Sequence, residues 1–113
     1  MHTGGDLDST GLPELFQTEW CPASRRVRQR LTELDVSYVC RQVPVDRDDR
    51  IALLSVTGGD TIPALVSEDG RVLVGEDEIL AYLDERYEEP AGAEAHRVKA
   101  QKVRRRELEE ASR

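Results

Sequence analysis

A cysteine followed at once by a proline, in Cys21-Pro22-Ala23-Ser24, separates a short apolar stretch from an arginine-rich amphipathic segment. Proline suits the first turn of a helix, where its missing N–H costs nothing, so we expect Cys21 at the mouth of that helix. There, unpaired backbone N–H groups and the positive end of the helix dipole favour a thiolate. The sequence therefore predicts a strand, a nucleophilic cysteine and a helix in immediate succession.

Ser24 stands where a second cysteine would complete a Cys-x-x-Cys pair. The site can attack a disulfide but cannot close one within its own motif. We expect Ser24 either to donate a hydrogen bond to the Cys21 thiolate, which would lower its pKa, or only to cap the helix. Trp20 either shields one side of the sulfur and supplies an apolar rim or anchors the loop as a lone aromatic.

The length of 113 residues indicates one domain with a single core. Residues 1–11 show no periodic apolar pattern and are predicted to be a disordered leader. They lack the basic start and apolar stretch of a secretory signal, and no run is apolar enough to span a membrane. With two cysteines and no export signal, we expect a cytoplasmic protein with reduced thiols.

Charged residues make up 35% of the chain, the formal net charge is −7, and only two of the sixteen basic residues are lysines. This acid excess resembles the surface of a halophilic organism's protein, where salt screens self-repulsion; an ordinary acidic protein is the alternative. Either way, the charge disfavours nucleic acid as a partner, because the chain would repel phosphate.

Apolar periodicity predicts an α/β fold with the order βαβ, then α, then ββα. Strands are expected over 12–17, 37–43, 61–66 and 71–74, and helices over 24–34, from Ile51 to the stop at Gly58, and over 76–87. Ile51 and Leu54 are expected to bury the second helix. Asp69-Gly70 predicts a hairpin turn. A crossover helix would make the first two strands parallel, and the hairpin would complete a four-stranded mixed sheet flanked by helices.

This order and four motifs resemble the thioredoxin superfamily, most closely glutaredoxins and the amino-terminal domain of glutathione transferases. The resemblance implies a domain over 12–89 and a charged helical tail over 90–113. A full glutathione transferase continues with a long helical domain, whereas about two dozen residues remain here, which argues against conventional transferase chemistry. The motifs are Cys21-Pro22-Ala23-Ser24, Thr61-Ile62-Pro63, Gly75-Glu76-Asp77 and Ile79-x-x-Tyr82-Leu83-Asp84-Glu85-Arg86-Tyr87.

By this resemblance, Pro63 is a cis proline that faces Cys21 and leaves the backbone N–H and C=O of Ile62 free to pair with a bound thiol peptide. A trans proline at a strand start is the alternative. The helix that begins at Glu76 and Asp77 would hold a γ-glutamyl group, its carboxylate at the helix N-terminus and its ammonium on Asp77. Acids in a first turn are also ordinary helix starters.

Two positions depart from the family pattern. An acid at Glu76 is unfavourable beside a ligand carboxylate, and Thr18 stands where glutaredoxins commonly carry a lysine for the glycine carboxylate. Arg25 or Arg26 could replace that lysine, although solvated surface charge is the simpler role for each. We therefore consider two co-substrates, glutathione and γ-glutamylcysteine, which lacks the glycine carboxylate, and expect no tightly bound cofactor.

Three remaining features have competing interpretations. Cys40 is expected to be a buried small hydrophobe, with a remote resolving thiol as the alternative. His2 and His96 show no spacing that suggests a metal site. The tail carries six basic residues and no acid between His96 and Arg106, and is interpreted first as a solvated helix. It could also dock on the acidic third helix, or bind a partner or RNA.

The resemblance implies a glutaredoxin-like thiol–disulfide oxidoreductase with a one-cysteine site, in which Cys21 acts with Ser24 on disulfide-bearing protein substrates. A low-molecular-weight thiol would regenerate the enzyme. One alternative is a non-catalytic thiol-binding or iron–sulfur carrier module, which Pro22 in place of glycine and the missing lysine disfavour. Another is a transferase-like domain used for protein interaction.

Overall fold

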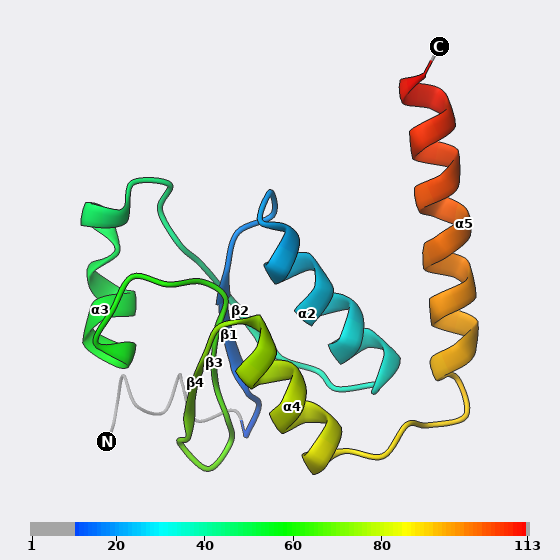
Figure 1. Ribbon diagram of the computed structural model, residues 1–113. Helices are drawn as coiled ribbons and strands as arrows, with labels where there is room; N and C mark the ends of the chain where they lie inside the picture. Colours follow the sequence, from blue (N-terminus) through cyan, green and yellow to red (C-terminus); the bar gives the residue numbers. More distant parts are fainter. Residues whose placement is uncertain (1–10, 113) are drawn as a thin grey trace.

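The computed structural model describes residues 11–112 (Figure 1). The predicted leader, apart from Gly11, lies outside the described residues. The predicted order of elements is confirmed, and each strand is shorter than predicted. Near the ends of the first three strands lie Pro13, Pro44 and Pro63, which cannot donate to a ladder. The elements are β1 (Glu14–Gln17), α2 (Pro22–Glu33), β2 (Val39–Gln42), the 3₁₀ turn η1 (Arg47–Asp49), α3 (Ile51–Thr57), β3 (Ala64–Val66), β4 (Val72–Val74), α4 (Glu76–Arg86) and α5 (Ala93–Ala111).

The four strands form one mixed sheet in the order β2-β1-β3-β4. β1 and β2 are parallel, β3 is antiparallel to both β1 and β4, and the hairpin turn ends at Gly70, whose φ is 88°. Phe16 on β1 lies opposite Ala64 on β3. The residues just before β3 therefore lie beside the end of β1, where the chain enters the cysteine motif.

Helices cover both faces of the sheet, with α2 and α4 on one side and α3 on the other (Figure 1). Each face of the sheet carries one cluster of buried side chains. Successive side chains of β1 point to opposite faces, so Leu15 packs in the first cluster and Phe16 in the second. The first cluster consists of Leu15, Val27, Leu31, Leu34, Leu65, Leu73, Ile79, Tyr82 and Leu83. The second consists of Phe16, Val43, Leu53 and Ala64.

The prediction for the buried face of α3 is wrong. Ile51 and Leu54 are 69% and 54% exposed, whereas Leu53 is 1% exposed. The inward position expected for Ile51 is taken by Arg50, which is buried and donates to the carbonyls of Pro44 (2.8 Å), Val45 (3.1 Å) and Asp60 (2.8 Å). This guanidinium holds the two ends of the α3 region together and sets which stripe of the short helix meets the sheet.

The prediction that Cys40 is buried is also wrong. Its side chain is exposed, because β2 is an edge strand of the sheet. Cys40 lies on a polar edge, where Gln17 Nε2 donates a hydrogen bond to its sulfur at 3.1 Å. The β-branched residues of 37–43 predicted the strand but not its place in the sheet, and that place decides whether a small residue is covered.

The predicted helical tail is confirmed as α5, which begins beside α2 and α4 and ends away from the sheet (Figure 1). Ala93 is its one buried residue among those described. Ion pairs hold its first turns: Arg97 contacts Glu33 of α2 at 3.2 Å and Glu89 of the preceding loop at 2.8 Å. Arg30 of α2 also contacts Glu89. Over residues 11–112, no helix has the length and apolar character needed to cross a membrane.

Candidate functional site

Cys21 lies at the junction between β1 and α2, as its N-cap residue. A tight turn from Thr18 precedes it, closed by the Cys21 N–H donating to the Thr18 carbonyl at 3.4 Å. Pro22 occupies the first helical turn. The backbone N–H of Ser24 donates to the Cys21 sulfur at 3.3 Å, so the sulfur takes the place of the oxygen that usually caps a helix.

The environment of Cys21 favours the thiolate. Burial of the sulfur raises the pKa of Cys21, but the hydroxyl and N–H of Ser24, the N–H of Ala23 and the charge of Arg26 together lower it below its ordinary value. Among these donors, the Ser24 N–H is the one with hydrogen-bond geometry in the structure. These groups thus stabilise the thiolate form of Cys21 relative to an ordinary thiol.

Two residues near Cys21 in the chain carry buried hydroxyls, Thr18 and Ser24. Ser24 is fully buried and Thr18 is 4% exposed, and neither hydroxyl oxygen has a hydrogen-bond partner in the described part of the chain. A buried hydroxyl without a partner is costly in a folded protein. The Ser24 hydroxyl is among the groups that lower the pKa of Cys21, although it makes no hydrogen bond within the described residues.

The peptide bond between Ile62 and Pro63 is cis. Pro63 is buried, and its carbonyl accepts from the Gly75 N–H at 2.9 Å, which ties the loop to the start of α4. Neither the N–H nor the C=O of Ile62 makes a hydrogen bond within residues 11–112. The sheet register sets this loop beside the end of β1, so an unpaired stretch of backbone lies at the end of the sheet that carries Cys21.

The N-termini of α2 and α4 are joined by a bidentate ion pair. Arg26 Nη2 lies 2.8 Å from Glu76 Oε1, and Arg26 Nε bonds the other carboxylate oxygen. This pairing lowers the pKa of Glu76 and raises that of Arg26. Asp77, the next residue, is exposed and makes no ion pair with any side chain that the structure describes.

The structure thus brings together the cysteine, the cis proline loop and the start of α4, and it places other candidates elsewhere. Trp20 is 60% exposed, so it is no anchor in the core. Arg25 is exposed on α2. Cys40 forms no disulfide with Cys21. No group of three His, Cys, Asp or Glu side chains suited to a metal is present in 11–112.

Sequence reasoning missed the pairing of Arg26 with Glu76. The two residues are fifty positions apart, and nothing in the local pattern of either helix marks the other as its partner. The signal that was present is charge: an arginine in the first turns of one helix and a glutamate opening another, in a fold that sets both N-termini at the same end of the sheet. Treating the two motifs together would have suggested the contact.

Residues 15–91 match the family described as glutathione S-transferase, N-terminal domain. This match covers more than half of the chain, and the chain belongs to that family. No curated protein matches it.

Solved structures agree with this assignment. A glutathione S-transferase from Rhodospirillum rubrum F11 is 25% identical over 72% of this chain and 39% of its own, with a TM-score of 0.58. FzlA from C. crescentus is 27% identical over 70% of this chain and 36% of its own, with a TM-score of 0.63. Glutaredoxin 2 from Salmonella typhimurium, solved in complex with glutathione, is 21% identical over 64% of this chain and 32% of its own, with a TM-score of 0.57, and shows the fold alone. The chain thus spans about two-fifths or less of these relatives.

Proposed function

We propose that this chain is a glutaredoxin-like thiol–disulfide oxidoreductase with a single catalytic cysteine, Cys21, working in the cytoplasm. The observation that carries the proposal is the Ser24 N–H directed at the Cys21 sulfur, in a chain of the glutathione S-transferase N-terminal family. A thiolate at neutral pH is the nucleophile that disulfide exchange requires. The unpaired backbone of Ile62 supplies a surface on which an extended thiol peptide could lie.

In the first step, the Cys21 thiolate attacks the glutathione sulfur of a protein–glutathione mixed disulfide. A new sulfur–sulfur bond forms to Cys21, and the protein substrate leaves as a thiolate that takes a proton from solvent. In the second step, the thiolate of another glutathione attacks the glutathione sulfur bound to Cys21. Oxidised glutathione leaves and the Cys21 thiolate returns. Ser24 cannot resolve the intermediate as a second cysteine would, so the second thiol is obligatory.

Ligand roles follow from the groups at this end of the sheet. The N–H and C=O of Ile62 would pair with the cysteine residue of glutathione, beside Pro63. The N-terminus of α4 would hold the γ-glutamyl carboxylate, and Asp77 its ammonium. Trp20 and Pro22 would border the sulfur. The objection to an acid at Glu76 is weakened, since Arg26 already compensates its charge.

Two small thiols are candidates for the co-substrate, glutathione and γ-glutamylcysteine. Family membership supports glutathione, whereas Thr18 in place of the lysine supports γ-glutamylcysteine. Rates of mixed-disulfide reduction measured with each thiol separate the two: a clear preference for glutathione rejects γ-glutamylcysteine, and a clear preference for γ-glutamylcysteine rejects glutathione.

The main test compares Cys21→Ser with Cys40→Ser in a turnover assay on a glutathionylated peptide. We expect Cys21→Ser to abolish activity and Cys40→Ser to keep most of it, because Cys40 is exposed on an edge strand and caps no helix. Equal loss in both variants would overturn the assignment. Transferase chemistry is the competing activity, and conjugation of glutathione to a chloronitrobenzene without disulfide reduction would favour it.

A further inference from the structure

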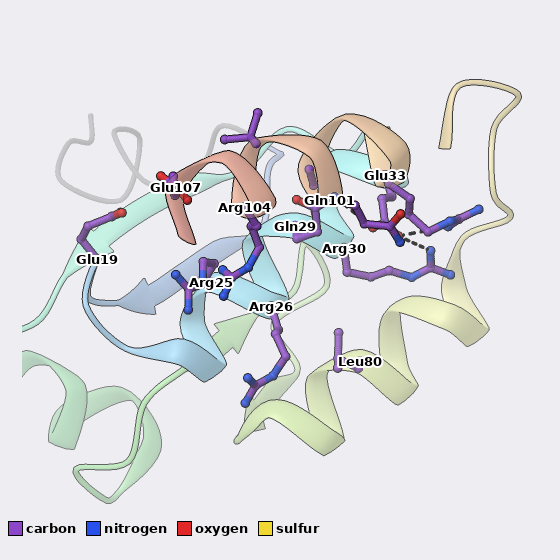
Figure 2. Close-up of a pocket in the computed structure, with 13 residues that line it drawn as sticks. Glu19, Arg25, Arg26, Gln29, Arg30, Glu33, Leu80, Gln101, Arg104 and Glu107 are labelled. Carbon is purple, nitrogen blue, oxygen red and sulfur yellow. Dashed lines mark hydrogen bonds and ion pairs between the residues drawn. The ribbon is translucent and has the colours of Figure 1, made fainter. Parts of the chain in front are cut away.

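An open groove of about 840 Å³ runs between α5 and α2, the helix that Cys21 caps (Figure 2). Leu80, Ala100 and Val103 supply its apolar lining. The other lining side chains are polar or charged, and five of them are arginines: Arg25, Arg26, Arg30, Arg97 and Arg104. Cys21 itself does not line the groove. The groove is therefore a separate surface beside the proposed reaction site.

Most charges in this groove are already paired. Glu19 contacts Arg28 at 3.2 Å, and Arg26 is engaged by Glu76. Arg30 and Arg97 share carboxylates, including Glu33, at 2.9 and 3.2 Å. The charges of Arg26, Arg30 and Arg97 are therefore already compensated by neighbouring carboxylates.

Arg25, Arg104 and Glu107 are the exceptions among the charged lining residues, since none of the three side chains makes an ion pair within residues 11–112. Neither guanidinium makes a hydrogen bond or ion pair with any of residues 11–112, and in Figure 2 they come from α2 and α5 toward the same part of the groove. Glu107, one turn beyond Arg104, lies toward Glu19, at the same end of the groove as these two arginines (Figure 2). Two facing cations repel each other, and a carboxylate between them could accept hydrogen bonds from both.

Other basic side chains of α5 lie outside the groove. Lys99, Lys102, Arg105 and Arg106 are exposed but do not line it, in a chain whose net charge is −7. The two unpaired arginines of the lining are therefore the groups that would select a carboxylate on a ligand in the groove. A nucleic acid is disfavoured, because a continuous polyanion would meet the acidic remainder of the molecule.

We propose that the groove between α2 and α5 binds an acidic peptide segment, through Arg25 and Arg104, next to the cysteine of the protein disulfide substrate. The substrate role rests on the function proposed for Cys21. Arg25 is one helical turn from Cys21, with their Cβ atoms about 5–6 Å apart. An extended chain advances about 3.3 Å per residue, so the preferred acids lie about two to four residues from the substrate cysteine.

The kinetic test uses two glutathionylated peptides that differ only in Asp or Asn at those positions. Wild-type protein is expected to reduce the Asp peptide with about tenfold higher kcat/KM, as two exposed charge contacts allow. Arg25→Gln and Arg104→Gln should each reduce this preference to about threefold, because each removes one of two comparable contacts, and the double variant should abolish it. Arg105→Gln is the matched control: it removes the same charge from α5, lies outside the groove lining and should keep the preference.

A binding test separates this inference from the redox assignment. Anisotropy of a labelled peptide without cysteine is measured with Cys21→Ser protein, for which no turnover is possible. Tighter binding of the Asp peptide, reduced with Arg25→Gln or Arg104→Gln, supports the groove even if the wild-type protein reduces neither mixed disulfide. Equal binding of both peptides overturns it. Stronger binding of a single-stranded oligonucleotide, dependent on the same arginines, also overturns it in favour of nucleic acid.

Discussion

The backbone N–H of Ser24 lies 3.3 Å from the sulfur of Cys21 and donates to it. This contact makes one residue both the N-cap of α2 and the candidate nucleophile. Capping normally satisfies helix N–H groups with a neutral or anionic oxygen. Here the same need of the helix favours a charged sulfur, so folding of the helix and activation of the thiol depend on one interaction.

The first prediction concerns the ionisation of Cys21. Alkylation rates of the Cys40→Ser variant with iodoacetamide, measured against pH by mass spectrometry, should follow a single titration. Its midpoint should lie below the ordinary thiol value of about 8.5, because the surrounding donors lower the pKa of Cys21. A midpoint at or above 8.5 contradicts an activated thiolate and would favour an interaction domain without redox chemistry.

Replacement of the Ser24 hydroxyl should change reactivity more than stability. Ser24→Ala removes a donor to the thiolate, so the alkylation midpoint should move toward higher pH. The hydroxyl has no partner in the described residues, so thermal unfolding should change little. Ser37→Ala, at an exposed position, is the control. An unchanged midpoint would limit Ser24 to its backbone contact.

Neighbouring leucines on α3 should differ sharply in their contribution to stability. Leu53 is 1% exposed and Leu54 is 54% exposed. Leu53→Ala should lower the free energy of unfolding by about 2–5 kcal/mol, the usual cost of a buried leucine. Leu54→Ala should cost about 0.5 kcal/mol or less. Urea denaturation of both variants measures this, and equal losses would contradict the position of α3 on the sheet.

The attachment of α5 should weaken in acid. Arg97 and Arg30 lower the pKa of Glu89 from its ordinary value of 4.5 to about 2. A depressed carboxyl pKa stabilises the folded contact at pH values above 4.5, and this stabilisation is lost as pH falls through about 2. Hydrogen exchange of residues 93–100, followed from pH 5 to pH 2 with correction for intrinsic rates, should show progressive loss of protection.

A substitution distinguishes this contact from general acid unfolding. Glu89→Gln should release α5 at neutral pH, with exchange of the sheet unchanged. Glu94→Gln is the control, because Glu94 pairs with Arg97 within α5 and does not join it to another element. High salt should act like Glu89→Gln, since these groups are on the surface. Full protection of α5 in Glu89→Gln would show that other contacts hold the helix.

The order of strands and helices could be predicted because each element carries its own period and end signals. Asp69-Gly70 marked the hairpin, and Gly58, with a φ of 81°, marked the end of α3. The two errors share a cause. Cys40 is exposed because its strand lies at the edge of the sheet. Ile51 is exposed because Arg50, which binds loop carbonyls from two segments, takes the inward position. Both are long-range facts that a local pattern does not contain.

Part of the candidate site was also predictable from the sequence. A cysteine before a proline indicates a helix start wherever it occurs, and the cis bond at Pro63, expected from the family resemblance, is present. The contact between Arg26 and Glu76, and the approach of Arg104 to Arg25, join residues from separate helices. Their positions follow from how α2, α4 and α5 pack, which the local pattern of each helix does not contain.

The two lysines of the chain, Lys99 and Lys102, both lie on the exposed surface of α5. Reagents directed at side-chain amines, such as succinimidyl esters for biotin or dyes, will therefore modify this helix and spare every other side chain of residues 11–112. Immobilising the protein through its lysine side chains would attach it by α5 and obstruct the neighbouring groove. For surface-based measurements, coupling through a tag is the better choice.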